Sequence, residues 1–320
     1  MRIVFMGTPD FSVPVLESLL DSRHEVVAVV TQPDRPKGRG KEIQMSPVKE
    51  TALARGTAVY QPARARDGEF IEKMRALAPD LMVVIAYGQI LPQELLDVPR
   101  FGCINIHASL LPRYRGAAPI QWAVINGDKE TGVTTMMMDA GMDTGDMLET
   151  RVVPIDEKET GGSLFDKLSF LGGELILSTI DRLEAGTLVR TPQDDGQATY
   201  VSKISKELGE IDWGRSAVEI ERLIRGLNPW PSAYTHCGGK LLKLWDADVE
   251  KRADQPGQPE CPEFSEPGTV LTAAGDVLRI QTGDGVLRVR TLQLEGKKRM
   301  DTAAFLRGFA IAPGTVLGKE

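Results

Sequence analysis

Short apolar runs alternate with amphipathic stretches along the first half of the chain. The runs are apolar at nearly every position, which is typical of strands covered on both faces. The stretches between them place apolar residues at helical spacing. We therefore expect strands at 3–6, 25–31, 57–60, 80–88, 102–109 and 132–139, and helices at 13–20, 46–55, 67–78 and 160–185. This alternation predicts an α/β fold with a Rossmann-like, mainly parallel sheet and right-handed crossovers.

The pattern changes after Gly186. A polar, irregular segment leads to one helical stretch and then to short alternating strands separated by glycine turns, such as Asp284-Gly285. Such spacing favours a small β-barrel or sandwich. A proline-rich stretch at 251–268 is expected to be a mobile loop. The sequence thus predicts an N-terminal domain over 1–187, a linker over 188–206 and a C-terminal domain over 207–320.

Composition narrows the class of protein. The chain has 320 residues and a formal net charge of −7, which argues against indiscriminate binding to nucleic acid. Three dispersed cysteines, Cys103, Cys237 and Cys261, give neither a disulfide framework nor paired metal ligands. Together with the lack of a long apolar run, they predict a reducing, cytoplasmic setting.

The turn after the first strand is a candidate nucleotide site, but its residues argue against one. It has the sequence Gly7-Thr8-Pro9-Asp10-Phe11 and lacks the G-x-G-x-x-G fingerprint. Pro9 also removes a backbone N–H that a pyrophosphate would use. Three dispersed histidines leave little from which to build a metal site, so we expect no metal.

The run 102–112 carries two polar residues at the end of a predicted buried strand. Asn105 and His107 leave the same face of that strand because side chains alternate. The carboxyl ends of parallel strands are where open α/β sheets place their ligands. An amide donor beside an imidazole suits acyl transfer, since both can stabilise an oxyanion and the imidazole can also move protons. The alternative is that the two side chains satisfy each other or nearby backbone groups.

A second motif follows the predicted strand at 132–139. Asp139-Ala140-Gly141-Met142-Asp143-Thr144-Gly145-Asp146 is a tight loop that can present one carboxylate inward. A carboxylate near His107 would orient the ring and stabilise its charged form. The alternatives are a simple turn or a calcium loop, although the spacing does not match the EF-hand pattern.

Asn-x-His, the stretch Ser109-Leu110-Leu111-Pro112 and the Asp-x-Gly-x-Asp-x-Gly-Asp loop together resemble the folate-dependent formyltransferases. The resemblance covers about the first 190 residues. It implies 10-formyltetrahydrofolate as the formyl donor, no metal, and Asn105, His107 and Asp143 as catalytic residues. It also implies folate contacts from Ser109, Leu110, Leu111 and Pro112, and from the loop at Tyr87 and Gly88. For that loop, a merely buried strand end is an equal alternative.

Five further stretches, GTPDF, TQPDRPKGRGK, SLLPRYRGAAPIQWA, MDTGDM and NPWPSA, narrow the resemblance within that family. They imply methionyl initiator tRNA as the formyl acceptor, an OB-like C-terminal barrel that binds RNA, and a monomer. The product would be formylmethionyl initiator tRNA for translation initiation. A barrel with a purely structural role remains an alternative.

One basic stretch in an otherwise acidic half fits such a partner. It carries the side chains Arg35, Lys37, Arg39 and Lys41. With two glycines and few apolar anchors, we expect it to be mobile alone and ordered on tRNA phosphates. A solvated surface loop is the alternative. A second basic cluster lies in the C-terminal domain and comprises Arg288, Arg290, Lys297, Lys298 and Arg299.

Three rival functions share parts of this pattern. A formyltransferase of purine synthesis would not need the C-terminal domain, and the basic stretch weighs against an amino-sugar nucleotide as acceptor. An RNA-binding protein on an inactive formyltransferase fold is disfavoured by the intact Asn105, His107 and Asp143.

Overall fold

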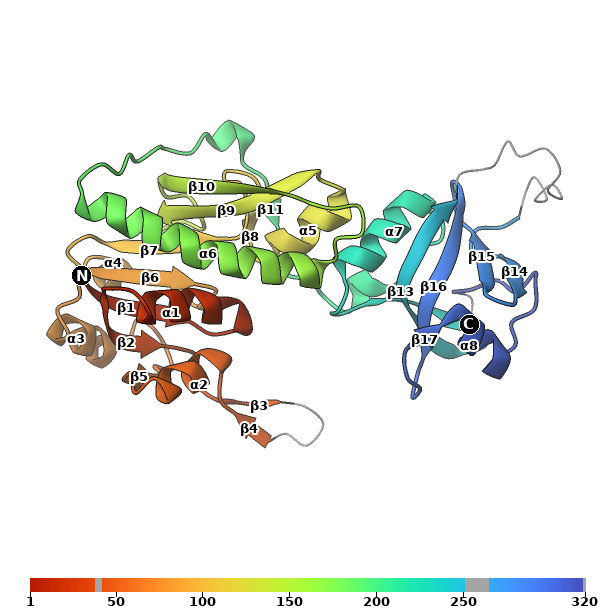
Figure 1. Ribbon diagram of the computed structural model, residues 1–320, viewed down its shortest axis with the longest axis horizontal. Helices are drawn as coiled ribbons and strands as arrows, with labels where there is room; N and C mark the ends of the chain where they lie inside the picture. The colour runs from red at the N-terminus through yellow and green to blue at the C-terminus, as the bar shows by residue number, and fades with distance from the viewer. Residues whose placement is uncertain (38–41, 251–264, 319–320) are drawn as a thin grey trace. The chain divides into compact units, whose positions relative to one another are not determined.

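The computed structural model describes residues 1–37, 42–250 and 265–318. Two compact units make up the chain (Figure 1). The N-terminal unit comprises Met1–Pro119, Glu130–Pro154 and Phe165–Ser202, and the C-terminal unit comprises Ile120–Lys129, Ile155–Leu164 and Lys203–Glu320. Residues 188–202, which lie in the predicted linker, thus cluster with the N-terminal unit. The domain boundaries expected from the sequence, at 187/188 and 206/207, stay a prediction.

A seven-stranded sheet forms the centre of the N-terminal unit. Its spatial order is β10 (Met147–Pro154), β9 (Glu130–Met137), β7 (Cys103–His107), β6 (Leu81–Ile85), β1 (Arg2–Gly7), β2 (Glu25–Val30) and β5 (Val59–Tyr60). Neighbours from β7 to β5 pair in parallel, whereas β9 pairs antiparallel with both β7 and β10. The sheet is therefore mostly parallel, with an antiparallel strand near one edge.

Helices cover both faces of this sheet because its strands are apolar on both sides. The helices of this unit are η1 (Asp10–Ser12), α1 (Val13–Leu20), α2 (Pro47–Ala54), α3 (Gly68–Ala76), α4 (Gln93–Leu96) and most of α6 (Gly161–Glu184), whereas α5 (Pro119–Asn126) clusters with the C-terminal unit. Val4 and Met6 of β1 pack in one buried cluster with Phe70 and Met74 of α3. Figure 1 shows α1 and α6 crossing the other face.

Three small elements complete the N-terminal unit. Strands β3 (Arg35–Lys37) and β4 (Glu42–Gln44) pair antiparallel, and we refer to this strand pair as the basic hairpin. Strand β8 (Arg115–Gly116) pairs in parallel with β11 (Tyr200–Val201), and the turn η2 (Asp195–Gln197) precedes β11. The last pairing joins two segments 85 residues apart, which local periodicity cannot predict.

The C-terminal unit is built on an antiparallel sheet. Its strands run in the order β12 (Ala233–Cys237), β13 (Lys240–Glu250), β16 (Val286–Leu294), β15 (Val277–Gln281) and β14 (Val270–Ala274), and β17 (Met300–Asp301) pairs with β16. Helices η3 (Glu207–Gly209), α7 (Ala217–Gly226) and α8 (Thr302–Gly308) accompany it. The fold class predicted from the sequence is thereby confirmed: a mostly parallel α/β sheet and an all-antiparallel C-terminal sheet domain.

Helix α7 shows how local sequence defines these elements. Ser216 caps its first turn by accepting from the Glu219 N–H, and the Glu219 carboxylate accepts from the Ser216 N–H in return. Ile220 and Ile224 then enter the core of the sheet. None of the helices described in either unit combines the length and apolar composition that a membrane span requires.

Candidate active site

Strand β7 ends with the predicted catalytic residues. Ile106 faces α6, since its Cγ2 lies 3.2 Å from where a Cβ on Gly172 would be. Alternation then directs Asn105 and His107 to the opposite face. Asn105 is half-buried, and its amide finds no hydrogen-bond partner in the described part of the chain. A partly buried amide without a protein partner is free to donate to a ligand.

His107 is buried and has a neighbour at each ring nitrogen. Nε2 lies 2.9 Å from the carbonyl oxygen of Tyr114, which can only accept, so Nε2 carries a proton. Nδ1 lies 3.7 Å from Oδ1 of Asp143. The carboxylate therefore faces Nδ1. In this conformation both ring nitrogens are engaged, so the oxyanion role predicted for His107 would require Nε2 to leave the Tyr114 carbonyl.

The loop after β9 presents Asp143 to that ring. Oδ1 of Asp139 accepts from the N–H of Gly141 at 2.9 Å and from the hydroxyl of Thr144 at 2.7 Å. Gly145 approaches the Met137 carbonyl so closely that any Cβ would clash with it. Asp143 itself has a φ of 54°, in the left-handed region that non-glycine residues rarely adopt. Its Oδ2 accepts from the N–H of Gly116 at 2.9 Å.

The stretch predicted to contact folate turns directly after β7. Ser109 is fully buried, and its hydroxyl donates to the carbonyl of Arg113 at 2.6 Å. Leu111 is also buried, and its N–H donates to Thr134 Oγ1 at 3.3 Å. Leu110 and Pro112 are half-buried. The Ser109 hydroxyl and the Leu111 N–H thus hold the turn in place. Folate binding by this stretch stays a prediction.

The loop after β6 is the second stretch predicted to contact folate. Tyr87 is buried, which raises the pKa of its phenol to about 12. Its carbonyl accepts from Thr8 Oγ1 and from Gln32 Nε2, both at 3.1 Å, so the ends of β1, β2 and β6 are tied together. Gly88 has a φ of 85° and is exposed. The loop therefore offers backbone at Gly88 to a ligand, while the Tyr87 side chain belongs to the core.

Two of the four residues predicted to bind tRNA, Arg35 and Lys37, lie on strand β3 of the basic hairpin. Arg35 is exposed, and its guanidinium donates to Gln32 Oε1 at 3.4 Å. Lys37 lies at the end of β3, and Arg39 and Lys41 lie outside the described residues. At the base of the hairpin, Lys49 Nζ donates to Asp34 Oδ2 at 2.5 Å. This bond holds the pKa of the Asp34 carboxyl below its usual value.

The second basic cluster lies on the C-terminal sheet and its turns. Arg290 donates to Asp248 at 2.6 Å and Arg288 to Asp276 at 3.3 Å, so acidic neighbours neutralise both. Lys297, Lys298 and Arg299 are exposed, and the Arg299 guanidinium stacks 4.5 Å over the Trp245 ring. RNA binding by this unit stays a prediction, and these three residues are the exposed part of the cluster.

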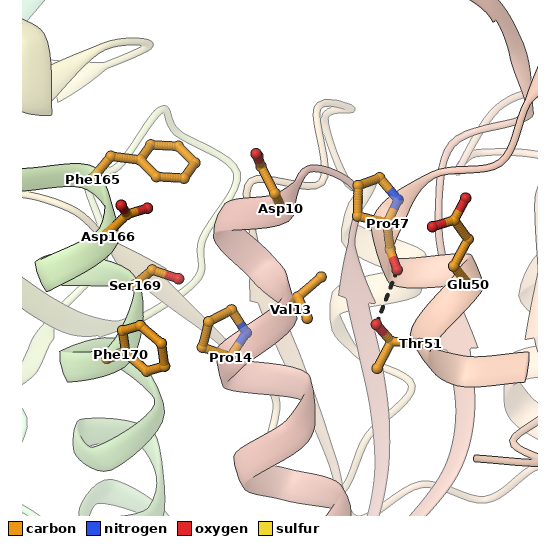
Figure 2. Close-up of a pocket in the computed structure, with 10 residues that line it drawn as sticks. All are labelled: Asp10, Val13, Pro14, Pro47, Glu50, Thr51, Phe165, Asp166, Ser169 and Phe170. Carbon is orange, nitrogen blue, oxygen red and sulfur yellow. Dashed lines mark hydrogen bonds between the residues drawn. The ribbon is translucent and has the colours of Figure 1, made fainter. Parts of the chain in front are cut away.

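A hollow of about 370 Å³ lies beside the turn after β1 (Figure 2). It is lined by α6 on one side, η1 and α1 in the middle, and α2 on the other, with the side chains Asp10, Val13, Pro14, Pro47, Glu50, Thr51, Phe165, Asp166, Ser169 and Phe170. None of the predicted site residues lines it. Its three carboxylates disfavour phosphate groups, so we do not expect an RNA backbone to enter it.

One group in the described chain has the donor types of a metal site. His24, Asp181 and Glu184 bring a ring nitrogen and two carboxylates within 4.8 Å of one another. However, Arg23 donates to both carboxylates, at 2.6 and 2.7 Å, and the Met1 amino group lies 3.3 Å from His24 Nδ1. Cationic groups of the chain itself therefore neutralise this cluster, which disfavours a metal ion there.

Sequence reasoning missed Arg115 and Gln193. Arg115 is 1% exposed and donates to Gln193, Asp195 and Tyr200. Gln193 lies in the segment predicted to be a linker. The one signal available was the arginine itself, since a basic residue three positions after the predicted folate stretch needs a partner if it is buried.

Comparison with known proteins gives the class to which this site belongs. The model of the "Formyl transferase" family matches residues 1–180, and that of the "Formyl transferase, C-terminal domain" family matches residues 203–310. The chain belongs to the formyl transferase family.

Full-length relatives narrow the class further. The chain is 54% identical over 319 residues to the methionyl-tRNA formyltransferase of Lachnospira eligens, with 100% of both chains covered. It is 56% identical to that of Agathobacter rectalis, covering 98% of this chain and 99% of the relative, and 47% identical to that of Clostridioides difficile, covering 99% and 100%.

Solved structures share the fold at lower identity. The N-formyltransferase from Helicobacter canadensis, in complex with folinic acid and dTDP-3-aminofucose, matches with a TM-score of 0.68 at 18% identity, covering 94% of this chain and all of that one. HypX from Aquifex aeolicus, in complex with tetrahydrofolic acid, matches with a TM-score of 0.62 at 20% identity, covering 96% of this chain and 47% of that one. Both neighbours carry a folate.

Proposed function

We propose that this formyltransferase moves the formyl group of 10-formyltetrahydrofolate to the amino group of methionyl-tRNA and so makes formylmethionyl initiator tRNA for translation initiation. The full-length relatives named above are methionyl-tRNA formyltransferases, and the match extends over both domains. The observation that carries the chemistry is the half-buried Asn105 amide, which has no hydrogen-bond partner in the described residues. It lies on the same strand as His107, two residues before it, and His107 in turn faces Asp143.

The proposed reaction is an acyl transfer between two nitrogens. The neutral amino group attacks the formyl carbon, the C–N bond to the substrate amine forms, and the bond between the formyl carbon and folate N10 breaks. Asn105 donates a hydrogen bond to the oxygen that becomes negative in the tetrahedral intermediate. Asp143 holds His107 and assists, through water, the removal of the proton that the attacking amine loses, and folate N10 takes up a proton as it leaves.

The amine needs little activation by a base. A free α-amino group has a pKa of about 8, so a useful fraction is neutral near pH 7. The rate then depends mainly on holding the amine near the formyl carbon and on stabilising the oxyanion. This requirement fits a site whose loops are held by many hydrogen bonds.

Folate and tRNA are proposed to bind to different stretches of the chain near this site. Folate would lie against Leu110, Pro112 and the exposed backbone at Gly88, with the Ser109 hydroxyl, the Leu111 N–H and the Tyr87 carbonyl holding the two turns. The tRNA backbone would contact the basic hairpin through Arg35, Lys37, Arg39 and Lys41. A monomer in the cytoplasm is the expected setting, and both parts of that expectation stay predictions.

A comparison of two formyl acceptors, supplied separately, tests this function. The purified chain is given 10-formyltetrahydrofolate with methionyl-tRNA or with an amino-sugar nucleotide, and formylated product is measured. Formylation of methionyl-tRNA alone supports the proposal. Formylation of the sugar nucleotide alone, or of neither acceptor, would refute it.

A further inference from the structure

We propose that Gln193, held in place by the buried guanidinium of Arg115, is a positioning residue for the pair His107 and Asp143. The inference deepens the proposed function and rests on it. It assigns a role in the site to a segment of the chain that carries no recognised catalytic motif.

Arg115 fixes the Gln193 side chain. The guanidinium is 1% exposed, and its Nε and Nη2 donate to Oε1 of Gln193 at 3.0 and 2.9 Å. Nη2 also donates to Asp195 Oδ1 at 2.8 Å, and Nη1 donates to the Tyr200 hydroxyl at 3.1 Å. A buried guanidinium is stable only when its donors are satisfied, and here these partners come from one segment, 193–200.

This arrangement determines which way the Gln193 amide points. Arginine has only donors, so Oε1 of Gln193 must face the guanidinium. Nε2 must then face the other way, where it donates to the carbonyls of Asp143 and Gly145, each at 2.8 Å. Both amide atoms are therefore used, and the amide cannot flip without losing four hydrogen bonds.

The two carbonyls held by Gln193 are those of Asp143 itself and of a residue two positions later. Asp143 has a φ of 54°, a conformation that an aspartate keeps only when its surroundings impose it. Gln193 holds the backbone of this residue, and the Gly116 N–H holds its carboxylate. Asp143 is thereby fixed at both ends, 3.7 Å from His107.

The residues on either side of Arg115 contact the same pair. The Tyr114 carbonyl accepts from His107 Nε2, and the Gly116 N–H donates to Asp143. The segment that supplies Gln193 also holds this stretch, because the Arg115 N–H donates to the carbonyl of Thr199 at 2.8 Å. Segment 193–201 thus fixes the surroundings of both His107 and Asp143. Gln193 contacts neither ring nor carboxylate, so its role is positioning.

Two substitutions at Gln193 distinguish a role in positioning His107 and Asp143 from a role in the stability of the fold alone. Gln193→Glu keeps the acceptor for Arg115 but places a carboxylate oxygen against the carbonyls of Asp143 and Gly145. Gln193→Ala removes both sets of bonds. Gln197→Ala is the matched control, since Gln197 is exposed in the same segment and donates to Asp194.

The full-length chain and its variants are compared for kcat, for KM toward methionyl-tRNA and 10-formyltetrahydrofolate, and for the ring-proton NMR signals of His107. We expect both Gln193 variants to lower kcat by about tenfold or more, since small displacements of reacting groups have such effects. We expect both KM values to stay within about twofold and the His107 signals to move in Gln193→Glu. Gln197→Ala should match the parent in every readout.

Two results would overturn the inference: a kcat for Gln193→Glu within about twofold of the parent, or unmoved His107 signals. If the parent itself formylates no methionyl-tRNA, the proposed function fails. The NMR comparison still decides whether Gln193 positions His107 and Asp143.

Discussion

The end of β7 and the basic hairpin differ in how the protein holds their functional side chains. His107 and Asp143 are held by hydrogen-bonded or ion-paired neighbours drawn from segments as far apart as Gly116 and Gln193. In the hairpin, Arg35 is exposed and has one long hydrogen bond, to Gln32. Chemistry at the first region needs fixed geometry, whereas binding of a phosphate backbone needs accessible charge. The predictions below test this division.

The largest effect is expected at the end of β7. Asn105→Ala should lower the rate of formyl transfer by about 10²–10³, the usual effect of removing one oxyanion donor, and His107→Ala should also lower the rate because it removes the ring that Asp143 faces. The affinity for methionyl-tRNA and the Tm should stay close to those of the parent. Single-turnover transfer and equilibrium tRNA binding measure the two effects. Near-parent rates in both variants would remove these residues from the catalytic machinery.

The next effect concerns the carboxylate. Asp143→Asn keeps an acceptor for the Gly116 N–H but removes the negative charge 3.7 Å from His107. The rate should fall about tenfold or more, and the pH profile of transfer should change because the substitution removes an ionisable group beside His107. Transfer rates from pH 6 to 9 test this. An unchanged profile would mean that Asp143 does not act through His107.

The hairpin should show the opposite behaviour. Arg35→Ala and Arg39→Ala should weaken tRNA binding, with the larger effect at Arg39. Each lost phosphate contact should reduce the slope of log binding constant against log salt concentration by about 0.7–1. Folate affinity and the saturated rate should not change. Arg75→Ala is a matched control, since it removes an exposed arginine on α3 that pairs with Glu72. Equal salt slopes for the parent and the hairpin variants would make the hairpin an ordinary solvated surface.

A smaller effect is expected on folate affinity when the exposed glycine of the loop after β6 is replaced. Gly88→Ala places a methyl group on exposed backbone, where the nearest atom is Gln32 Nε2 at 3.9 Å. Gly56→Ala is matched, because that glycine has a φ of 68° and open space around it. Both changes should lower stability by about 1 kcal/mol through backbone strain. Only Gly88→Ala should weaken folate binding in equilibrium titration; equal folate affinity in the two variants would place the folate elsewhere.

The smallest effect lies at the base of the hairpin. The hydrogen bond from Lys49 lowers the pKa of Asp34 below 3.8, so the folded state favours the ionised carboxylate. The resulting stability is complete above about pH 4 and is lost as the pH falls through the lowered value. Between pH 3 and 6, Asp34→Asn should flatten the dependence of Tm on pH. Parallel curves for parent and variant would show that this bond does not stabilise the hairpin base.

The regular part of the fold was predictable because its signals are local. The apolar run 80–88 gave β6, and the helical spacing at 160–185 gave α6. Strand β10 was missed because it is largely exposed and carries Glu149 and Arg151 among its apolar residues. Residues 251–264, which fall in the predicted mobile loop, lie outside the described chain.

The candidate site divides in the same way. Asn105 and His107 share a strand, and a short loop presents Asp143, so motif spacing was sufficient to group them. Arg115 and Gln193 could not be grouped, because their contact joins positions 78 residues apart. No periodicity connects such positions, and the burial of an arginine is a property of the folded chain alone.

A double-variant cycle tests most directly whether catalysis and tRNA binding are separate. The saturated transfer rate and the tRNA Kd are measured for the parent, His107→Ala, Arg35→Ala and the double variant. Independent regions predict a double variant that has the rate of His107→Ala and the Kd of Arg35→Ala, within about 0.5 kcal/mol. A rate or Kd in the double variant that departs from these values by more than that would contradict the division.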